Sequence, residues 1–184
     1  VKLYGQEVNL LTSAIAKMNM LLHDIEEFDI ARGDTLKEPK FTNADKLQQF
    51  DVIFANPPYS IKKWDRKSFG SDIYARNTHG VPPQSCADYA FFQHIIKSLK
   101  SKTGRAAMLW PHGVLFRDQE KDIRKSIIAS DLIEAVIGLG PNLFYNSPME
   151  SCVVVLEQNK KKGEKNASTL DNASENDDEE KEGE

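Results

Sequence analysis

The sequence predicts an α/β fold built around a largely parallel sheet, and three observations support this prediction. Short apolar runs alternate with longer segments whose apolar residues recur at helical spacing. Residues 50–55 (FDVIFA) form a near-continuous apolar run, which is typical of a strand buried on both faces of a parallel sheet. Strands that alternate with helices along a chain indicate a sheet of this kind.

The predicted elements follow one another as strand, helix, strand, strand, helix, strand, helix, strand, strand. The first helix is amphipathic, and its apolar residues share one face: Leu11, Ile15, Met18 and Leu22. The second helix opens with Ser85 and Asp88 at the spacing of a capping box. Residues 60–84 are rich in glycine and proline and are expected to form a long loop. We expect strands at residues 2–5, 28–34, 51–55, 104–110, 132–139 and 150–158, and helices at residues 9–24, 85–100 and 119–130.

Composition limits the class of protein. The 184 residues suit a single domain, and a hydrophobic content of 40% allows a sizeable core. No apolar stretch approaches the roughly 20 residues of a membrane span, and we expect no secretory leader. Two cysteines are too few for a disulfide framework, so we expect a cytoplasmic protein. The four histidines show no metal-ligand spacing, and no metal site is predicted.

Charge is unevenly distributed along the chain. The last 25 residues carry five lysines and nine acidic residues, which accounts for the whole net charge of −4. We expect residues 1–159 to form the folded domain and residues 160–184 to be a disordered acidic tail. The remaining body is neutral, whereas a protein that binds DNA alone usually has a basic surplus. If this protein acts on nucleic acid, we therefore expect another subunit to supply most contacts to phosphate.

The segment Asn56-Pro57-Pro58-Tyr59 directly follows the apolar run. The prolines must end the strand, so Asn56 is expected at its carboxyl end, where open α/β sheets bind ligands. The side-chain carbonyl of Asn56 and the backbone carbonyl of Pro57 can accept the hydrogens of an amino group on a nucleobase, which localises its lone pair. The ring of Tyr59 offers a surface for base stacking, and we expect the ring rather than the hydroxyl to matter. An isolated Asn-Pro pair is usually only a turn, but the buried strand and aromatic ring favour the functional interpretation.

These residues carry a resemblance to a known family. "NPPY" after "FDVIFA" resembles the catalytic motif of S-adenosylmethionine-dependent amino-methyltransferases. Seven segments in the same order resemble modification (M) subunits of type I restriction-modification systems: LYGQEVN, MNMLLHDI, GDTL, FDVIFANPPYS, GRAAMLWPHGVLFR, IRKSII and NLFYNS. The resemblance implies a Rossmann-like fold and methylation of adenine in DNA. It also implies four partners: DNA, a specificity subunit, a restriction subunit and a second M subunit.

The resemblance places the cofactor S-adenosylmethionine on four residues. Glu7 closes the first strand, where a carboxylate can accept hydrogen bonds from ribose hydroxyls; otherwise it is a solvated acid at a strand end. Asp34 of "GDTL" would accept from the adenine amino group of the cofactor, or be a turn residue. Asp88 and Phe91 match a helix start that borders the cofactor in this family, although Phe91 can equally belong to the core.

The loop after the NPPY segment places basic residues around Trp64. A loop of this length is usually functional or disordered, and basic residues around an aromatic ring suit contact with a splayed nucleic acid strand. Trp64 and Tyr59 are therefore the predicted substrate-binding residues. A solvated loop is the competing interpretation.

The resemblance also predicts what this chain lacks. The family holds the methionine part of its cofactor with a Gly-rich loop after its first strand, and no such loop is expected here, since the one G-x-G of the sequence, Gly138-Leu139-Gly140, lies far from "LYGQE". The missing strand is expected between the strands that end at Glu7 and at Asn56. We therefore expect this chain to be a C-terminal part of an M subunit and to be inactive alone. Two alternatives stay open: methylation of a glutamine side chain or an RNA base, and a non-enzymatic fragment that docks on a partner subunit.

Overall fold

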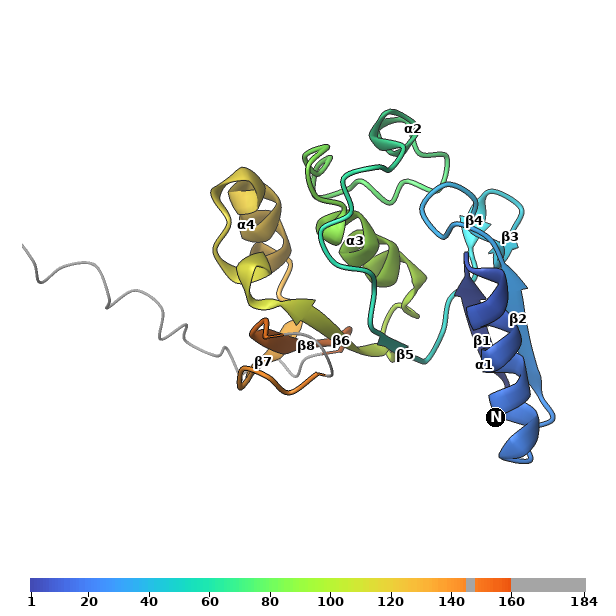
Figure 1. The fold of residues 1–184 in the computed structure, drawn as a ribbon. Helices are drawn as coiled ribbons and strands as arrows, with labels where there is room; N and C mark the ends of the chain where they lie inside the picture. The colour runs from blue at the N-terminus through green and yellow to red at the C-terminus, as the bar shows by residue number, and fades with distance from the viewer. Residues whose placement is uncertain (145–147, 160–184) are drawn as a thin grey trace, which may run out of the picture.

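The first part of the chain forms a small α/β unit (Figure 1). A computed structural model describes residues 1–144 and 148–159. In this unit β1 (Leu3–Glu7) pairs in parallel with β2 (Phe28–Arg32), and α1 (Leu10–Leu22) connects the two strands. Asn9 caps the helix, because its side chain accepts a hydrogen bond from the backbone N–H of Thr12. We call residues 1–34 the β1–α1–β2 unit.

The second part of the chain forms a four-stranded main sheet. Its strands lie in the order β5-β6-β8-β7. Strand β8 runs antiparallel to both of its neighbours, whereas β5 and β6 are parallel, so β5, β6 and β7 share one direction. The main sheet comprises β5 (Val52–Ala55), β6 (Arg105–Pro111), β7 (Ile133–Leu139) and β8 (Ser151–Glu157).

Two helices make the crossovers between the strands that share a direction. They are α3 (Asp88–Ser98), between β5 and β6, and α4 (Lys121–Ala129), between β6 and β7. Both lie on the same face of the main sheet (Figure 1). The core between helices and sheet is built around stacked rings, in which Phe92 packs on Tyr89 and on the fully buried Trp110. The predicted alternation of strands and helices is confirmed.

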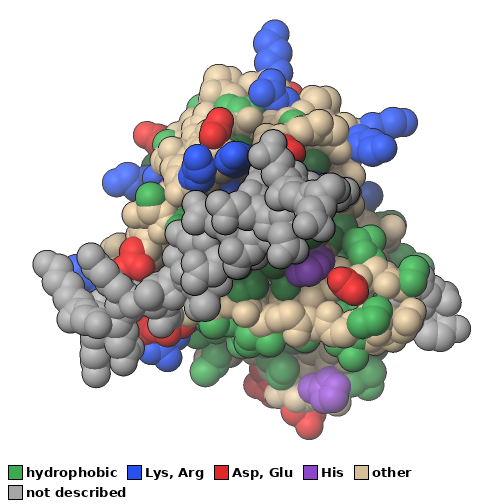
Figure 2. Space-filling model, turned by 90° about the vertical axis from the view of Figure 1, so that its left-hand side faces the viewer, with side chains coloured by type: hydrophobic (Ala, Val, Ile, Leu, Met, Phe, Trp, Pro, Cys, Tyr) green, Lys and Arg blue, Asp and Glu red, His purple; other side chains and the backbone are tan. Residues whose placement is uncertain are grey.

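The opposite face of the main sheet corrects one prediction. The apolar run at β5 was expected to be buried on both faces, but Phe54 is 82% exposed and Val52 is also exposed. Ile53 and Ala55 alternate with them and pack on the core. The prediction fails because both helices that cross this sheet cover the same face. Figure 2 shows hydrophobic side chains gathered in the lower half of the face that it views, at the level of the main sheet.

Helix α1 differs from its prediction in the same way. The four predicted residues form an apolar stripe along the helix, but the stripe is not buried. Each of them is 58% to 75% exposed: Leu11, Ile15, Met18 and Leu22. Ser13 is the only buried residue in residues 1–35, all of which the structure describes. The helix thus packs on its strands through small side chains and leaves its apolar stripe open.

Several short elements were not predicted. The hairpin of β3 (Thr42–Asn43) and β4 (Lys46–Leu47) follows β2, and α2 (Arg66–Gly70) interrupts the predicted loop. Two 3₁₀ turns, at His112–Leu115 and Asp118–Glu120, precede α4. The predicted acidic tail lies outside the described residues. Every helix in residues 1–144 and 148–159 is too short or too polar to cross a bilayer.

Candidate functional site

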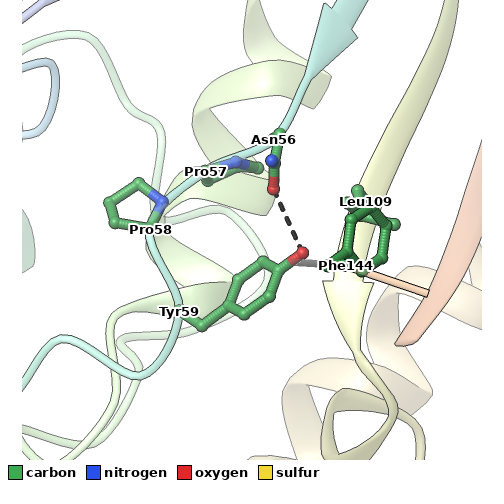
Figure 3. A pocket seen from close by; sticks show the side chains of 6 residues that line it. All are labelled: Asn56, Pro57, Pro58, Tyr59, Leu109 and Phe144. Carbon is green, nitrogen blue, oxygen red and sulfur yellow. Dashed lines mark hydrogen bonds between the residues drawn. The ribbon is translucent and has the colours of Figure 1, made fainter. Parts of the chain in front are cut away.

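The Asn56–Tyr59 turn follows the carboxyl end of β5, as predicted. Figure 3 shows the side chains of Asn56 and Tyr59 pointing toward each other, and the Tyr59 hydroxyl donates a hydrogen bond of 3.1 Å to Asn56 Oδ1. The turn lines a cavity of about 300 Å³ together with Leu109 of β6 and Phe144. A polar amide and an aromatic ring therefore share one small pocket at the end of a parallel strand.

Tyr59 has a more specific role than its ring alone. Its side chain is half-buried, and burial raises the pKa of the phenol, against the hydrogen bond with Ser151, which lowers it. The hydroxyl therefore keeps its proton and can donate to Asn56. This contact orients the carboxamide, because an amide whose oxygen accepts from Tyr59 cannot turn freely. The expectation that the ring matters more than the hydroxyl stays a prediction, although the hydroxyl has a defined partner in Asn56.

Ser60, the next residue, is held by a network that we call the Arg117 network: Ser60, Asp88, Arg117 and Glu120. Ser60 has a φ of 53°, which lies in the left-handed region and costs a residue with a side chain about 1–2 kcal/mol. Its backbone N–H donates to Asp88 Oδ1 at 2.6 Å. Arg117 Nη2 donates to the other oxygen of Asp88, also at 2.6 Å. An ion pair between the buried Asp88 and the partly exposed Arg117 thus stabilises the unusual backbone at the end of the turn.

The electrostatics of the network centre on one guanidinium. Arg117 also donates from Nε to Glu120 Oε2 at 2.7 Å, so two buried carboxylates share one cation. Burial alone would lower the pKa of Arg117, but the hydrogen bond to Asp88 and the charge of Glu120 raise it. Burial raises the pKa of Glu120, and Arg117 opposes that shift. Arg117 therefore stays charged.

Glu7 and Asp34 lie at the same edge of the β1–α1–β2 unit. Glu7 pairs with Arg32 in the register of the two parallel strands, and Asp34 follows two residues later. One oxygen of Glu7 accepts from the N–H of Asn9 at 2.7 Å. One oxygen of Asp34 accepts from the N–H of Leu36 at 2.9 Å. Each bond uses one of the two oxygens of its carboxylate.

Arg76 anchors the segment after Asp34 and was missed by sequence reasoning. Its guanidinium is buried and donates to the carbonyl oxygens of Thr35 at 3.0 Å and Leu36 at 2.7 Å. The same group forms a 2.7 Å ion pair with Asp72. Burial alone would raise the pKa of Asp72, but the hydrogen bonds from Arg76 lower it. The loop after the NPPY segment thus holds the loop after β2.

The comparison with known proteins decides the family. The whole chain, residues 1–184, matches the family model described as N-6 DNA Methylase. This chain belongs to the N-6 DNA methylase family. A relative is the type I restriction enzyme MjaVII methylase subunit of Methanocaldococcus jannaschii, 36% identical over 95% of this chain and 30% of the relative. The HindI methylase subunit of Haemophilus influenzae is 37% identical over 89% of this chain and 36% of its own length.

A solved structure supports the same assignment for this N-6 DNA methylase chain. The type I restriction-modification methyltransferase subunit of Streptococcus thermophilus superposes with a TM-score of 0.78 and 38% identity, over 86% of this chain and 34% of that one. The predicted Rossmann-like methyltransferase fold is therefore confirmed. The chain spans about a third of the length of these three relatives.

Asp88 is the first of the other predicted site residues. It was predicted to complete a capping box that begins at Ser85, and to border the cofactor. The capping box is wrong: α3 begins at Asp88 without a side-chain cap, and the Ser85 hydroxyl donates to Gln119. The Asp88 carboxylate instead accepts hydrogen bonds from the Ser60 N–H and from Arg117, both distant in the sequence. Its contact with the cofactor stays a prediction.

Phe91 and Trp64 both pack inside the methylase chain. Phe91 is partly buried and contacts both apolar clusters of the core. Trp64 packs edge-on against Phe69, with ring centroids 5.7 Å apart, and its ring N–H donates to the carbonyl of Gln84. Neither lines the pocket of the Asn56–Tyr59 turn among the described residues. The described residues also contain no cluster of three or more His, Cys, Asp or Glu side chains that could hold a metal ion.

Proposed function

We propose that the protein to which this chain belongs transfers a methyl group from S-adenosylmethionine to the exocyclic amino group of adenine in DNA. It would do so as the methylating subunit of a type I restriction-modification system. The observation that carries the proposal is the Asn56 carboxamide, oriented by Tyr59 at a pocket of about 300 Å³. That volume lies at the lower end of the roughly 300–1,000 Å³ of small-molecule sites, which suits a single base taken out of the duplex.

The chemistry follows from the acceptors at the turn. The lone pair of a nucleobase amino group is delocalised into the ring, so the amine is a poor nucleophile. Asn56 Oδ1 has two lone pairs and can accept from the amine while it still accepts from Tyr59. The carbonyl of Pro57 supplies the second acceptor. Fixed acceptors of this kind lower the barrier because they need no reorganisation during the reaction.

The amino nitrogen needs no general base before attack. Once it carries the methyl group it is positively charged and loses a proton readily to solvent. Positioning of the base therefore carries much of the rate. The Tyr59 ring lies beside the Asn56 amide (Figure 3), and stacking on it would contribute roughly 1–3 kcal/mol.

S-adenosylmethionine supplies the methyl group when bound. Two carboxylates at the carboxyl edge of adjacent parallel strands fit the polar adenosine half of this cofactor, since ribose hydroxyls and an amino group are donors. Glu7 would accept from the ribose, and Asp34 from the adenine amino group. The anchoring of the Asp34 loop supports this assignment, because Arg76 and Gln6 together fix the loop that carries the carboxylate.

The partners follow from charge and from the relatives. Residues 1–159 carry equal numbers of acidic and basic residues, so this body has no basic surplus for DNA. A specificity subunit would read the DNA bases and supply most phosphate contacts. A restriction subunit and a second methylating subunit would complete a cytoplasmic complex.

A methyl-transfer assay tests the proposal. The full-length subunit, assembled with its partner subunits, is incubated with S-adenosylmethionine labelled in the methyl group and with DNA, RNA or a glutamine-containing peptide in separate reactions. We expect label in DNA only, and N6-methyladenine after digestion and mass spectrometry. Label in RNA or peptide instead of DNA would contradict the proposal, and no transfer to any of the three would favour a non-enzymatic role.

A further inference from the structure

We propose that Arg117, acting through Asp88, is a positioning residue for the Asn56–Tyr59 turn. Its guanidinium fixes Ser60, and Ser60 fixes the direction in which Asn56 and Tyr59 face the pocket. The inference rests on the proposed function, because it assigns a role in the same reaction. It also gives Asp88 a task different from the cofactor contact that its place in the sequence predicts.

The contacts at Ser60 support this role. Asp88 is 0% exposed and accepts the Ser60 backbone N–H, while Arg117 Nη1 donates to the Ser60 hydroxyl at 3.3 Å. Ser60 is thus held at both its backbone and its side chain. A residue with positive φ stays in that conformation only when its surroundings determine it, and such residues cluster at functional sites.

Arg117 is itself held in place by contacts near the start of α4. It lies 57 residues from Ser60, between the 3₁₀ turns that precede α4. Glu120 binds its Nε, and the side chain of Arg124 on α4 donates to its backbone carbonyl at 3.0 Å. The backbone of Arg117 is therefore tied to α4, and its side chain is tied to Glu120, the residue before α4, and reaches across to the turn.

The shape of the guanidinium matters as much as its charge. One planar group donates to Asp88 and Glu120 and also reaches Ser60. A lysine has one point charge and cannot present donors in these separate directions at once. The described lining of the pocket does not include Arg117, so its replacement leaves the pocket walls chemically unchanged.

The test compares Arg117→Gln and Arg117→Lys in the full-length subunit, assembled with its partners. Arg105→Gln is the matched control, because Arg105 forms an ion pair of 2.7 Å with Glu157 on the surface, close to the 2.6 Å of Arg117 and Asp88. Three quantities are measured: kcat for methyl transfer to DNA, cofactor affinity by calorimetry, and hydrogen exchange of the peptide that contains Ser60. We expect kcat to fall about 100-fold in Arg117→Gln, the cost of a small misplacement of a reacting group.

Cofactor affinity should stay near that of the unsubstituted subunit, and exchange at Ser60 should become faster. Arg117→Lys should retain more activity than Arg117→Gln, and Arg105→Gln should change none of the three. A purely structural role would instead lower cofactor affinity and kcat together, and that result would overturn the proposal. Faster exchange with an unchanged kcat would overturn it too.

The exchange measurement separates this inference from the proposed function. If the unsubstituted subunit does not methylate DNA, the proposed function is wrong, and exchange at Ser60 still decides whether Arg117 holds the turn. An exchange rate that is the same in Arg117→Gln and the unsubstituted subunit would refute the role of Arg117. A faster rate confined to the Ser60 peptide would support it.

Discussion

The main sheet and the β1–α1–β2 unit have similar building blocks but different interiors. The main sheet and its helices enclose fully buried large side chains, among them Trp110, Met108 and Leu156. In the β1–α1–β2 unit only Ser13 is buried, and the apolar stripe of α1 faces outward. A helix that connects two parallel strands is therefore not enough to make a core. Each helix must also turn its apolar face toward the sheet.

Under the proposed function the two regions contribute different halves of the site. The Asn56–Tyr59 turn follows a strand of the main sheet and is held by the Arg117 network. Glu7 and Asp34 belong to the unit without a core: Glu7 accepts from Asn9 within that unit, and the loop after Asp34 is held by Gln6 and by Arg76. An aromatic cluster also joins the regions, with Tyr4 against Phe41 and Phe50 at ring distances of 5.2 Å. The residues proposed to bind the base are thus held by contacts around the main sheet, whereas the predicted cofactor residues are held partly by their own unit and partly by Arg76 from outside it.

The largest expected effect lies at the junction between the regions. Arg76→Met removes one partner of a buried ion pair, in which the side chains are 2% and 5% exposed. It leaves the Asp72 charge uncompensated, which typically costs about 3–5 kcal/mol. Urea unfolding of the full-length subunit measures the change. Arg105→Met is the matched control at an exposed pair, where a loss of about 0–1 kcal/mol is expected. If Arg76→Met and Arg105→Met lower the free energy of unfolding equally, the buried ion pair contributes no more to stability than the exposed one.

The second prediction concerns the preformed side of the site. Asn56→Ala should lower kcat for DNA methylation roughly 100- to 1,000-fold, which is the cost of removing one oriented polar group from a charge-developing site. Cofactor affinity by calorimetry should remain nearly intact, because Asn56 belongs to the main sheet rather than to the β1–α1–β2 unit. The control is Asn19→Ala on the exposed surface of α1, which should change neither quantity. Methylation at the unsubstituted rate would remove Asn56 from the mechanism.

The Arg117 network shows which part of the site sequence reasoning could predict. The turn was predicted because its chemistry is contiguous: a strand, an amide, two prolines and an aromatic ring. The support of the turn was not, because Ser60, Asp88 and Arg117 are separated by 28 and 29 residues and meet only in the fold. Asp88 itself was noticed for its helix-start position, but a local capping pattern cannot reveal a distant cation that competes for the same carboxylate.

The fold shows the same limit. The period of apolar residues predicted each long strand and helix, since periodicity is a local property. It could not predict which faces are covered: Phe54 and Ile15 are apolar, regular and exposed. The short hairpin of β3 and β4 was missed because its strands have two residues each, too few to show any period.

The third prediction returns to the junction and concerns pH. Burial, helped by the charge of Arg76 and opposed by that of Asp72, lowers the pKa of His94 to about 3. The unfolded chain takes up this proton near pH 6.5 and the folded chain does not, so stability falls as pH decreases from about 6.5 toward 3. The slope should reach about 1.4 kcal/mol per pH unit. His94→Asn keeps an acceptor near Arg76 but cannot titrate, so unfolding between pH 7 and pH 4 should show a flatter slope. An identical slope would show that other groups dominate.

The fourth prediction separates the ring of Tyr59 from its hydroxyl. Tyr59→Phe loses the hydrogen bond to Asn56, worth about 0.5–1.5 kcal/mol, or up to roughly tenfold in kcat. Tyr59→Ala loses the ring as well, which adds roughly 1–3 kcal/mol of base stacking. Steady-state methylation of DNA by both variants gives the two values. If Tyr59→Phe and Tyr59→Ala lower kcat equally, the ring contributes nothing to the reaction and base stacking on Tyr59 is refuted.

The smallest expected effect belongs to the unit without a core. Ile15 on α1 and Ile127 on α4 are both helical isoleucines, but Ile15 is 59% exposed and Ile127 is 0% exposed. Ile127→Ala should destabilise the 184-residue chain by about 2–5 kcal/mol, since it opens a cavity in the core. Ile15→Ala should change the free energy of unfolding by less than about 0.5 kcal/mol, as substitutions at open surface do. Alanine is also the better helix former, which offsets part of any contact that is lost. Urea titration followed by tryptophan fluorescence measures both.

The same pair of substitutions in the full-length subunit turns the comparison into a test of the α1 stripe. A surface that remains in solvent loses nothing when Ile15 is shortened, whereas a surface covered by the rest of the subunit loses both buried area and packing. We expect the cost of Ile15→Ala to rise above about 1 kcal/mol in the full-length subunit, because four aligned apolar residues in water are otherwise unfavourable. The cost of Ile127→Ala should be the same in both chains, since its core is complete. If Ile15→Ala is neutral in both chains, the β1–α1–β2 unit is stable with its stripe exposed, and the contrast between the two regions describes the whole subunit.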